Sequence, residues 1–140
     1  MEYNNLSEKH YIQYKELINS NINKEYFGHF ILSILNDNHI IMVLEDENKK
    51  IIGTGTILIE EKLTYGGCRM GHIENILIDE KYRGNGYGEK IVNKLLEICK
   101  DKKCYRVDLN CNSELEKFYE KNGFGKKHIC MNIYFKENFS

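Results

Sequence analysis

The chain has 140 residues, with 20 Lys and Arg against 21 Asp and Glu and a formal net charge of −1. This length favours one domain, residues 1–140, and the balanced charge gives no reason to expect a nucleic-acid or membrane partner. The first residues lack the basic flank and apolar run of a secretory signal, and no stretch approaches the roughly 18 apolar residues of a membrane span. A soluble cytoplasmic protein is therefore expected.

The cysteines and histidines give no sign of a disulfide framework or a metal site. The five cysteines are odd in number and contain no C-x-x-C pair. The five histidines are scattered along the chain, without the close Cys and His spacing that a zinc site needs. Reduced thiols and no bound metal are predicted.

The first part of the chain predicts two helices followed by an antiparallel hairpin. Apolar residues recur at helical intervals within residues 7–18 and again within residues 24–35. Runs rich in β-branched residues then occupy 39–45 and 51–61, with a polar turn at 46–50.

A third strand and a crossover are expected next. Residues 62–70 contain a Gly-Gly pair and predict a loop, and residues 71–79 predict a strand. Strict alternation along that strand would place Ile73, Asn75 and Leu77 on one face.

The rest of the chain alternates between helix and strand. After a helix ending near residue 100, we expect a strand at 104–110, a helix at 112–123 and a last strand at 128–135. Ser113 and Glu116 have the spacing of a capping box at the start of that last helix. The element order predicts an α/β fold with a mixed central sheet and helices on both faces.

Three glycines lie within five positions immediately before the long amphipathic helix, at Gly84, Gly86 and Gly88. A strand, a glycine loop and a helix in this order place backbone N–H groups at the positive end of a helix dipole, which suits a phosphate. A Walker loop would need Gly-Lys-Ser/Thr at its end, but Gly88 is followed by Glu89. A dinucleotide fingerprint would need the loop after the first strand of a βαβ unit, whereas here three antiparallel strands precede it.

The motif YRGNGYG at residues 82–88 resembles the R-x-x-G-x-G/A signature of the GNAT superfamily of acyl-CoA N-acyltransferases. The element order is similar to that superfamily, and FYEKNGF at 118–124 resembles its later helix and turn. Within it, residues 40–135 resemble the glucosamine-6-phosphate N-acetyltransferase family block by block, in GHIENILID, CYRVDLNC and KFYEKNGF above all. This family resemblance implies a GNAT fold and a cytoplasmic enzyme of UDP-N-acetylglucosamine biosynthesis.

The resemblance also implies where acetyl-CoA, the co-substrate, would bind. In the superfamily its pantetheine pairs with the edge of a splayed strand and its pyrophosphate lies on the glycine loop. Carried onto this chain, these positions are Ile76, Leu77, Ile78, Arg83, Gly84, Asn85, Gly86, Tyr87 and Gly88.

By the same resemblance, the amine of the substrate attacks the thioester directly, and Tyr119 protonates the departing thiolate. A backbone N–H near Ile76 would hold the oxyanion. Of the acidic residues that the family places beside the acceptor, Glu74 is present, but Asn75 and Asn110 are amides, which cannot take a proton. The proton acceptor is then Glu74 through a water, solvent itself, or Asp108 on the neighbouring strand.

For the substrate phosphate, the family pattern implies Lys62 and Arg106, with Glu74, Asn75 and Tyr105 as further substrate-binding positions. The arginine that the family usually carries in its last strand is Tyr134 here. Either Lys62 and Arg106, with Lys126 or Lys127, compensate for it, or the acceptor differs from the family's usual sugar phosphate.

The family forms homodimers through its last strand, and the apolar residues at 128–135 fit that role. The other possibilities are a monomer with an edge strand, a GNAT enzyme for another small amine or a protein N-terminus, and a non-catalytic CoA-binding module.

Overall fold

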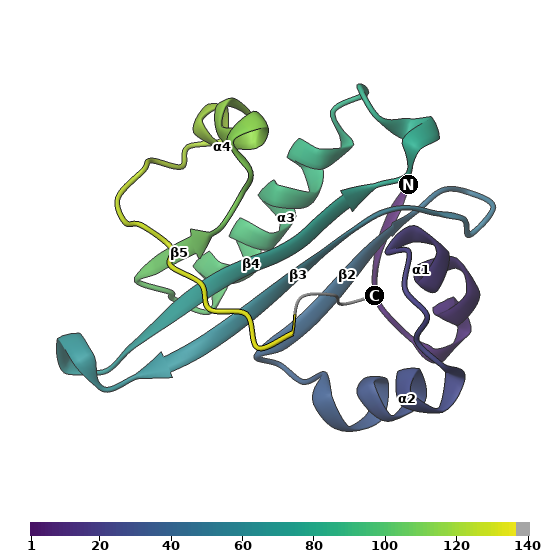
Figure 1. The fold of residues 1–140 in the computed structure, drawn as a ribbon, viewed down its shortest axis with the longest axis horizontal. Helices are drawn as coiled ribbons and strands as arrows, with labels where there is room; N and C mark the ends of the chain where they lie inside the picture. The colour runs from purple at the N-terminus through teal and green to yellow at the C-terminus, as the bar shows by residue number, and fades with distance from the viewer. Residues whose placement is uncertain (137–140) are drawn as a thin grey trace.

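The computed structural model of the protein describes residues 1–136, and its framework is a five-stranded sheet in the order β1-β2-β3-β4-β5 (Figure 1). The first four strands are antiparallel to their neighbours, whereas β4 and β5 are parallel. The predicted mixed α/β sheet is therefore confirmed. The strands are β1 (Glu2–Asn5), β2 (His39–Glu45), β3 (Ile51–Lys62), β4 (Cys68–Ile78) and β5 (Arg106–Leu109).

Four α-helices accompany the sheet: α1 (Tyr11–Leu17), α2 (Lys24–His29), α3 (Tyr87–Asp101) and α4 (Glu116–Lys121). A π-helical turn, Phe30–Ile34, extends α2. The predicted helices and the β2–β3 hairpin are confirmed. The strand β1 was not predicted, because its four residues EYNN carry no alternating apolar pattern.

The two faces of the sheet have separate cores, which confirms the expected helices on both faces. On one face, α3 buries Ile91, Leu95 and Cys99 against β3 and β4 residues such as Ile57 and Ile73. On the other face, α1 and α2 cover the sheet with a second cluster of buried residues: Leu6, Tyr14, Phe27, Ile41, Val43 and Ile51. Each amphipathic helix buries its apolar stripe on the sheet, as its period predicts.

The strict alternation predicted for β4 is wrong, because the strand contains a β-bulge. The register with β3 shifts between Thr54 and Thr56, where Asn75 adopts a φ of +51°. One extra residue reverses the facing of the side chains that follow it. Ile73 and Ile76 therefore both pack in the core beneath α3.

Two other local predictions differ from the structure. Residues Cys68–Met70, expected in a loop, begin β4, because they continue the pairing with the end of β3. The Ser113–Glu116 capping box is wrong: Ser113 lies inside a 3-10 turn, Ser113–Leu115, that leads into α4. Gly123, at φ +97°, does end that helix in the left-handed region.

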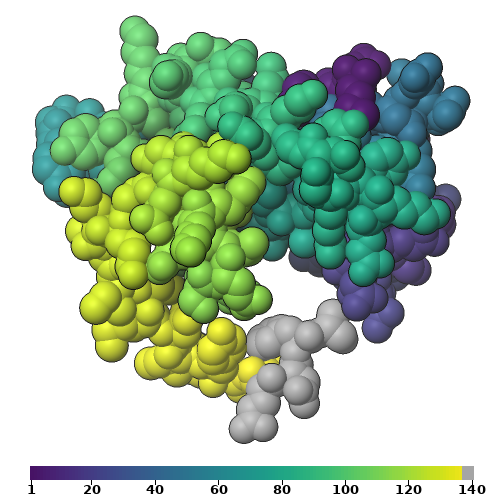
Figure 2. Space-filling view, turned by 90° about the horizontal axis from the view of Figure 1, so that it is seen from above, coloured from purple at the N-terminus to yellow at the C-terminus, as the bar shows by residue number. Residues whose placement is uncertain are grey.

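The last predicted strand, residues 128–135, is also not formed. The described chain after α4 has no strand, and its apolar side chains are exposed, with Phe135 at 95% and Ile129 at 89%. Figure 2 shows this segment, in yellow, projecting from the body of the molecule. A strand needs a paired neighbour, and no strand pairs with this segment within residues 1–136. No helix in this range is both long and apolar enough to cross a membrane.

Candidate active site

The strands β4 and β5 diverge halfway along the sheet. Their parallel ladder runs from Met70 opposite Arg106 to Ile73 opposite Leu109 and then stops. β4 continues to Ile78, whereas the chain after β5 turns away toward α4. The backbone edge that carries the expected pantetheine-binding residues Ile76, Leu77 and Ile78 therefore has no strand paired with it on the β5 side, within the described residues.

The glycine loop places free backbone N–H groups at the start of α3. Gly84 and Gly86 have φ values of +79° and +82°, a region that glycine adopts at little cost. Gly86 is the N-cap of the 15-residue helix α3, and no side chain caps this terminus. The first N–H groups of the helix are thus not used by any side-chain cap.

Side chains of the loop hold its shape. Arg83 donates from Nε to the carbonyl oxygen of Ile78 at 3.0 Å, and Asn85 donates from Nδ2 to the carbonyl oxygens of Tyr82 and Arg83 at 3.1 and 3.2 Å. Gly88 has a different role from the other two glycines. A Cβ there would lie 3.3 Å from Phe118 of α4, so this glycine permits close packing between two helices.

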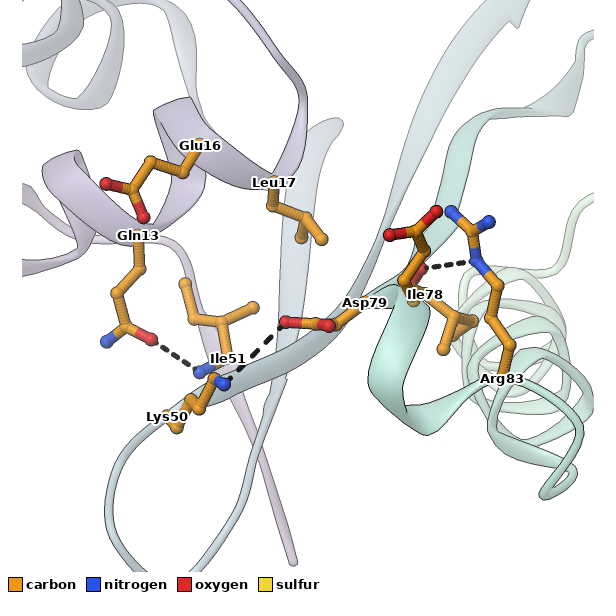
Figure 3. A pocket seen from close by; sticks show the side chains of 9 residues that line it. Gln13, Glu16, Leu17, Lys50, Ile51, Ile78, Asp79 and Arg83 are labelled. Atoms are coloured by element: carbon orange, nitrogen blue, oxygen red, sulfur yellow. Dashed lines mark hydrogen bonds and ion pairs between the residues drawn. The ribbon is translucent and has the colours of Figure 1, made fainter.

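A cavity of about 430 Å³ flanks the loop on the side of α1 (Figure 3). Gln13 from α1 accepts the N–H of Ile51 at 2.8 Å, and Lys50 lies 3.9 Å from Asp79 across the opening. Arg83 lines the far wall, where its guanidinium is held by the carbonyl oxygen of Ile78 at the end of β4. The remaining lining residues are Glu16, Leu17, Ile78 and Glu80.

A larger cavity of about 950 Å³ lies between β5, α4 and the segment that follows α4. It brings together most of the residues expected to act on the acceptor, although they come from four separate parts of the chain. Because the ends of β4 and β5 splay, their polar side chains and α4 can face the same space. The expected residues that line it are Glu74, Arg106, Asp108, Asn110, Tyr119, Lys126 and Lys127.

Tyr119 is held firmly at the wall of this cavity. Its ring packs edge-on against Phe118 and Phe124, with centroid distances of 5.0 and 5.9 Å, and the residue is only 8% exposed. Burial, and secondarily the charge of Cys111, raise the pKa of Tyr119 above its ordinary value of 10.0. The phenol therefore keeps its proton at neutral pH, as a proton donor must.

Charged side chains line the same cavity in pairs. Arg106 Nε lies 2.9 Å from Asp108 Oδ1, an ion pair whose angle does not make a hydrogen bond, so this buried N–H has no hydrogen-bond partner among the described residues. Lys126 Nζ lies 3.0 Å from Glu116 Oε1, and this hydrogen bond raises the pKa of Lys126. Cationic groups are thus present on two walls of the cavity.

Three expected substrate-binding residues lie outside this lining. Lys62 ends β3 opposite Cys68, and Tyr105 stacks on Tyr65 with ring centroids 5.0 Å apart and both rings exposed. Asn75 lies at the bulge, exposed to solvent.

The structure adds one pair that sequence reasoning missed. His72, which lines the large cavity, lies with Nε2 3.0 Å from Glu60 Oε1 on β3. His72 and Glu74 share a face of the strand, which is the signal that could have identified the histidine. Its pairing with Glu60 depends on the strand register, which the sequence does not reveal.

Residues 5–124 match the model of the acetyltransferase (GNAT) family. The chain therefore belongs to the acetyltransferase (GNAT) family. Among its relatives, the "Probable glucosamine 6-phosphate N-acetyltransferase 2" of Oryza sativa subsp. japonica is 41% identical over 107 residues, covering 74% of this chain and 64% of the relative. The "Glucosamine 6-phosphate N-acetyltransferase" of Arabidopsis thaliana is 42% identical over 100 residues, or 71% of this chain and 67% of that protein.

Solved structures agree with this assignment. The crystal structure of glucosamine-6-phosphate N-acetyltransferase from Arabidopsis thaliana has a TM-score of 0.89 and 33% identity, covering 96% of this chain and 98% of that one. An acetyltransferase structure from Trypanosoma brucei has a TM-score of 0.89 at 27% identity, covering 96% and 99%. The resemblance to the glucosamine-6-phosphate N-acetyltransferases, and the GNAT fold that it implied, are confirmed. The matched part of the chain spans just under two thirds of the rice relative.

Proposed function

We propose that this protein transfers the acetyl group of acetyl-CoA to the amine of glucosamine 6-phosphate. The observation that carries the proposal is the large cavity, which gathers Tyr119, Glu74 and Arg106 beside the point where β4 and β5 diverge. A protonated phenol, a carboxylate and a guanidinium suit an acceptor with an amine and a phosphate. The names of the relatives support the same substrate.

Acetyl-CoA fits the features of the cleft. The free N–H groups at the start of α3 suit its pyrophosphate, and the edge of Ile76–Ile78 that faces away from β3 suits its amide-bearing arm. A backbone N–H of this edge would stabilise the negative charge on the thioester oxygen as the amine attacks. Tyr119 would then protonate the departing sulfur. Nothing in this sequence of steps needs a covalent enzyme intermediate.

The phosphate of the acceptor would bind the cationic side of the large cavity. Arg106 is ion-paired with Asp108, but its Nε makes no hydrogen bond among the described residues, and Lys127 lines the same cavity. Lys126 is already engaged by Glu116. A charge-assisted hydrogen bond to phosphate contributes about 1.5–3 kcal/mol, so two such cations would offset the absence of an arginine at Tyr134.

We also propose a homodimer formed through the segment after α4. Its side chains Ile129, Met131, Ile133 and Phe135 are each more than 80% exposed. An apolar segment of this kind is costly to leave in water, and pairing it with a second copy would bury it. Such a partner would also close the large cavity, one wall of which is Ile129 and Cys130.

The test of the activity is the release of CoA thiol from acetyl-CoA with several amines. Glucosamine 6-phosphate is compared with glucosamine, glucose 6-phosphate, a polyamine and a peptide amine. We expect release only when amine and phosphate are on one molecule. Release with a different amine alone would overturn the sugar assignment, and release with none would favour a CoA-binding module.

A further inference from the structure

The pair of His72 and Glu60 lies on the sheet face opposite α3, beside the large cavity. Glu60 Oε1 contacts His72 Nε2 at 3.0 Å, and this is the only hydrogen bond of the His72 side chain within the described residues. His72 lies directly opposite Asp108 of β5 in the parallel register and two residues before Glu74. The histidine thus sits between a carboxylate that orients it and the residues expected to face the acceptor.

The contact with Glu60 fixes which ring nitrogen carries the proton. A carboxylate only accepts hydrogen bonds, so the neutral imidazole donates from Nε2 and leaves an unprotonated Nδ1. The same contact, and secondarily the charge of Lys62, lower the pKa of Glu60. Glu60 therefore stays ionised at neutral pH and can hold the N–H of the ring.

The amine of the amino sugar must lose a proton before it can attack the thioester. Of the basic groups in the cavity, one is better suited than the others to take that proton. Asn75 and Asn110 cannot take a proton, and Asp108 is paired with Arg106. A free carboxylate such as Glu74 is a weak base for an ammonium group, whereas an imidazole is matched to neutral pH.

Resting on the function proposed above, we propose that His72, oriented by Glu60, is the general base that takes the proton from the acceptor's ammonium group. The transfer is direct or passes through one water. The carboxylate of Glu60 stabilises the imidazolium that forms, and Glu60 is therefore a positioning residue.

The protons balance in this scheme. One proton of the ammonium group passes to His72 Nδ1 and then to solvent. The lone pair of the neutral amine forms the C–N bond, and the C–S bond breaks with its electron pair on sulfur. Tyr119 gives its proton to that sulfur. The second proton that nitrogen loses returns to Tyr119 through solvent.

The charged groups facing His72 from each packed strand are few. Glu60 and Lys62 come from β3, Glu74 from β4 itself, and Asp108 with Arg106 from β5. The cations Lys126 and Lys127 line the same cavity from the segment after α4. Among these groups, only Glu60 makes a hydrogen bond to the His72 ring. Substituting Glu60 therefore tests the orientation of the ring most directly.

The first experiment measures kcat against pH, roughly from pH 5 to 9, with saturating glucosamine 6-phosphate and acetyl-CoA, since kcat reports groups of the bound complex. We expect His72→Gln to lower kcat by about 100-fold and to remove the loss of activity at low pH. Glu60→Gln should lower kcat by about 10-fold and leave the KM for acetyl-CoA nearly unchanged, because the carboxylate no longer orients the His72 ring.

Glu61→Gln is the matched control, since the neighbouring Glu61 pairs with Arg69 at 2.9 Å and not with a histidine. Its pH profile should equal that of the wild type. As a second test, imidazole added to His72→Ala should restore part of the activity, which no structural role would allow.

An unchanged low-pH limb in His72→Gln would overturn the assignment of the base. The assignment would also be overturned if His72→Ala folds, has low activity and is not rescued by imidazole. A wild-type protein that releases thiol with another amine only would overturn the proposed substrate instead, and the variants would then be measured with that amine. Release with no amine would overturn both proposals.

Discussion

His10 Nε2 lies 3.3 Å from Glu45 Oε1, and both side chains are buried, at 2% and 1% exposed. The backbone N–H of Ser7 donates to His10 Nδ1 at 3.0 Å, so Nε2 carries the hydrogen and faces the carboxylate. Asn4 of β1 donates to the same oxygen at 2.9 Å. This network joins β1, the start of α1 and the end of β2 at the edge of the sheet.

Glu45→Ala is therefore expected to lower the free energy of unfolding by about 3 kcal/mol, because it leaves the buried ring N–H of His10 and the half-buried amide of Asn4 without an acceptor. Urea unfolding of the variant measures this loss. Glu47→Ala, exposed in the adjoining turn, is the control and should change stability by less than about 0.5 kcal/mol. Equal losses in the two variants would contradict the role of the network.

Tyr119→Phe should lower kcat by about 100-fold while leaving the affinity for acetyl-CoA nearly unchanged, because only the phenolic proton is removed. The raised pKa of Tyr119 means that the wild-type phenol stays protonated through neutral pH. Steady-state kinetics and CoA-binding calorimetry give the two values. Tyr26→Phe on the exposed face of α2 is the control. An unchanged kcat in Tyr119→Phe would remove this residue from the mechanism.

Asn75→Val should destabilise the protein by about 1–3 kcal/mol, since a β-branched residue is strained at a φ of +51°. Asn75→Gly fits this backbone without strain and should be close to neutral. Thermal unfolding of both variants tests the bulge in β4. Equal melting temperatures would mean that Asn75 does not adopt the left-handed conformation in solution.

Cys99 should resist alkylation in the folded protein. Burial, and then the neighbouring Cys104, raise the pKa of Cys99 from 9.0 to about 12, so almost no reactive thiolate forms at pH 8. Mass spectrometry after iodoacetamide treatment should find the exposed Cys111 and Cys130 modified first. Rapid modification of Cys99 under native conditions would contradict its burial.

The raised pKa of Cys99 also predicts a pH dependence of stability. The unfolded thiol ionises near 9.0 and the folded thiol near 12, so its contribution is fully present below pH 9 and is lost as pH rises toward 12. Urea unfolding of the wild type and of Cys99→Ala at pH 8 and pH 10 measures how much Cys99 contributes to the pH dependence of the free energy of unfolding. An equal pH dependence in both proteins would rule it out.

The sequence by itself predicted the helices and strands whose hydrophobic pattern repeats over neighbouring residues. β2, β3 and α3 follow directly from runs of β-branched residues and from an apolar stripe, and the glycine loop follows from its spacing before a helix. The prediction succeeded there because each signal arises from neighbouring residues that share one face. Tyr119 and Glu74 were named instead through the family resemblance of their motifs, and both line the large cavity.

Only the tertiary structure decided which strands pair and which side chains meet. The polar strand β1 forms because β2 offers it an edge, and the bulge at Asn75 reverses a facing that simple alternation would assign. The contact of His72 with Glu60 joins two strands whose register no local pattern encodes. Pairing and register are set by burial summed over the whole sheet, which is why the sequence read locally could not supply them.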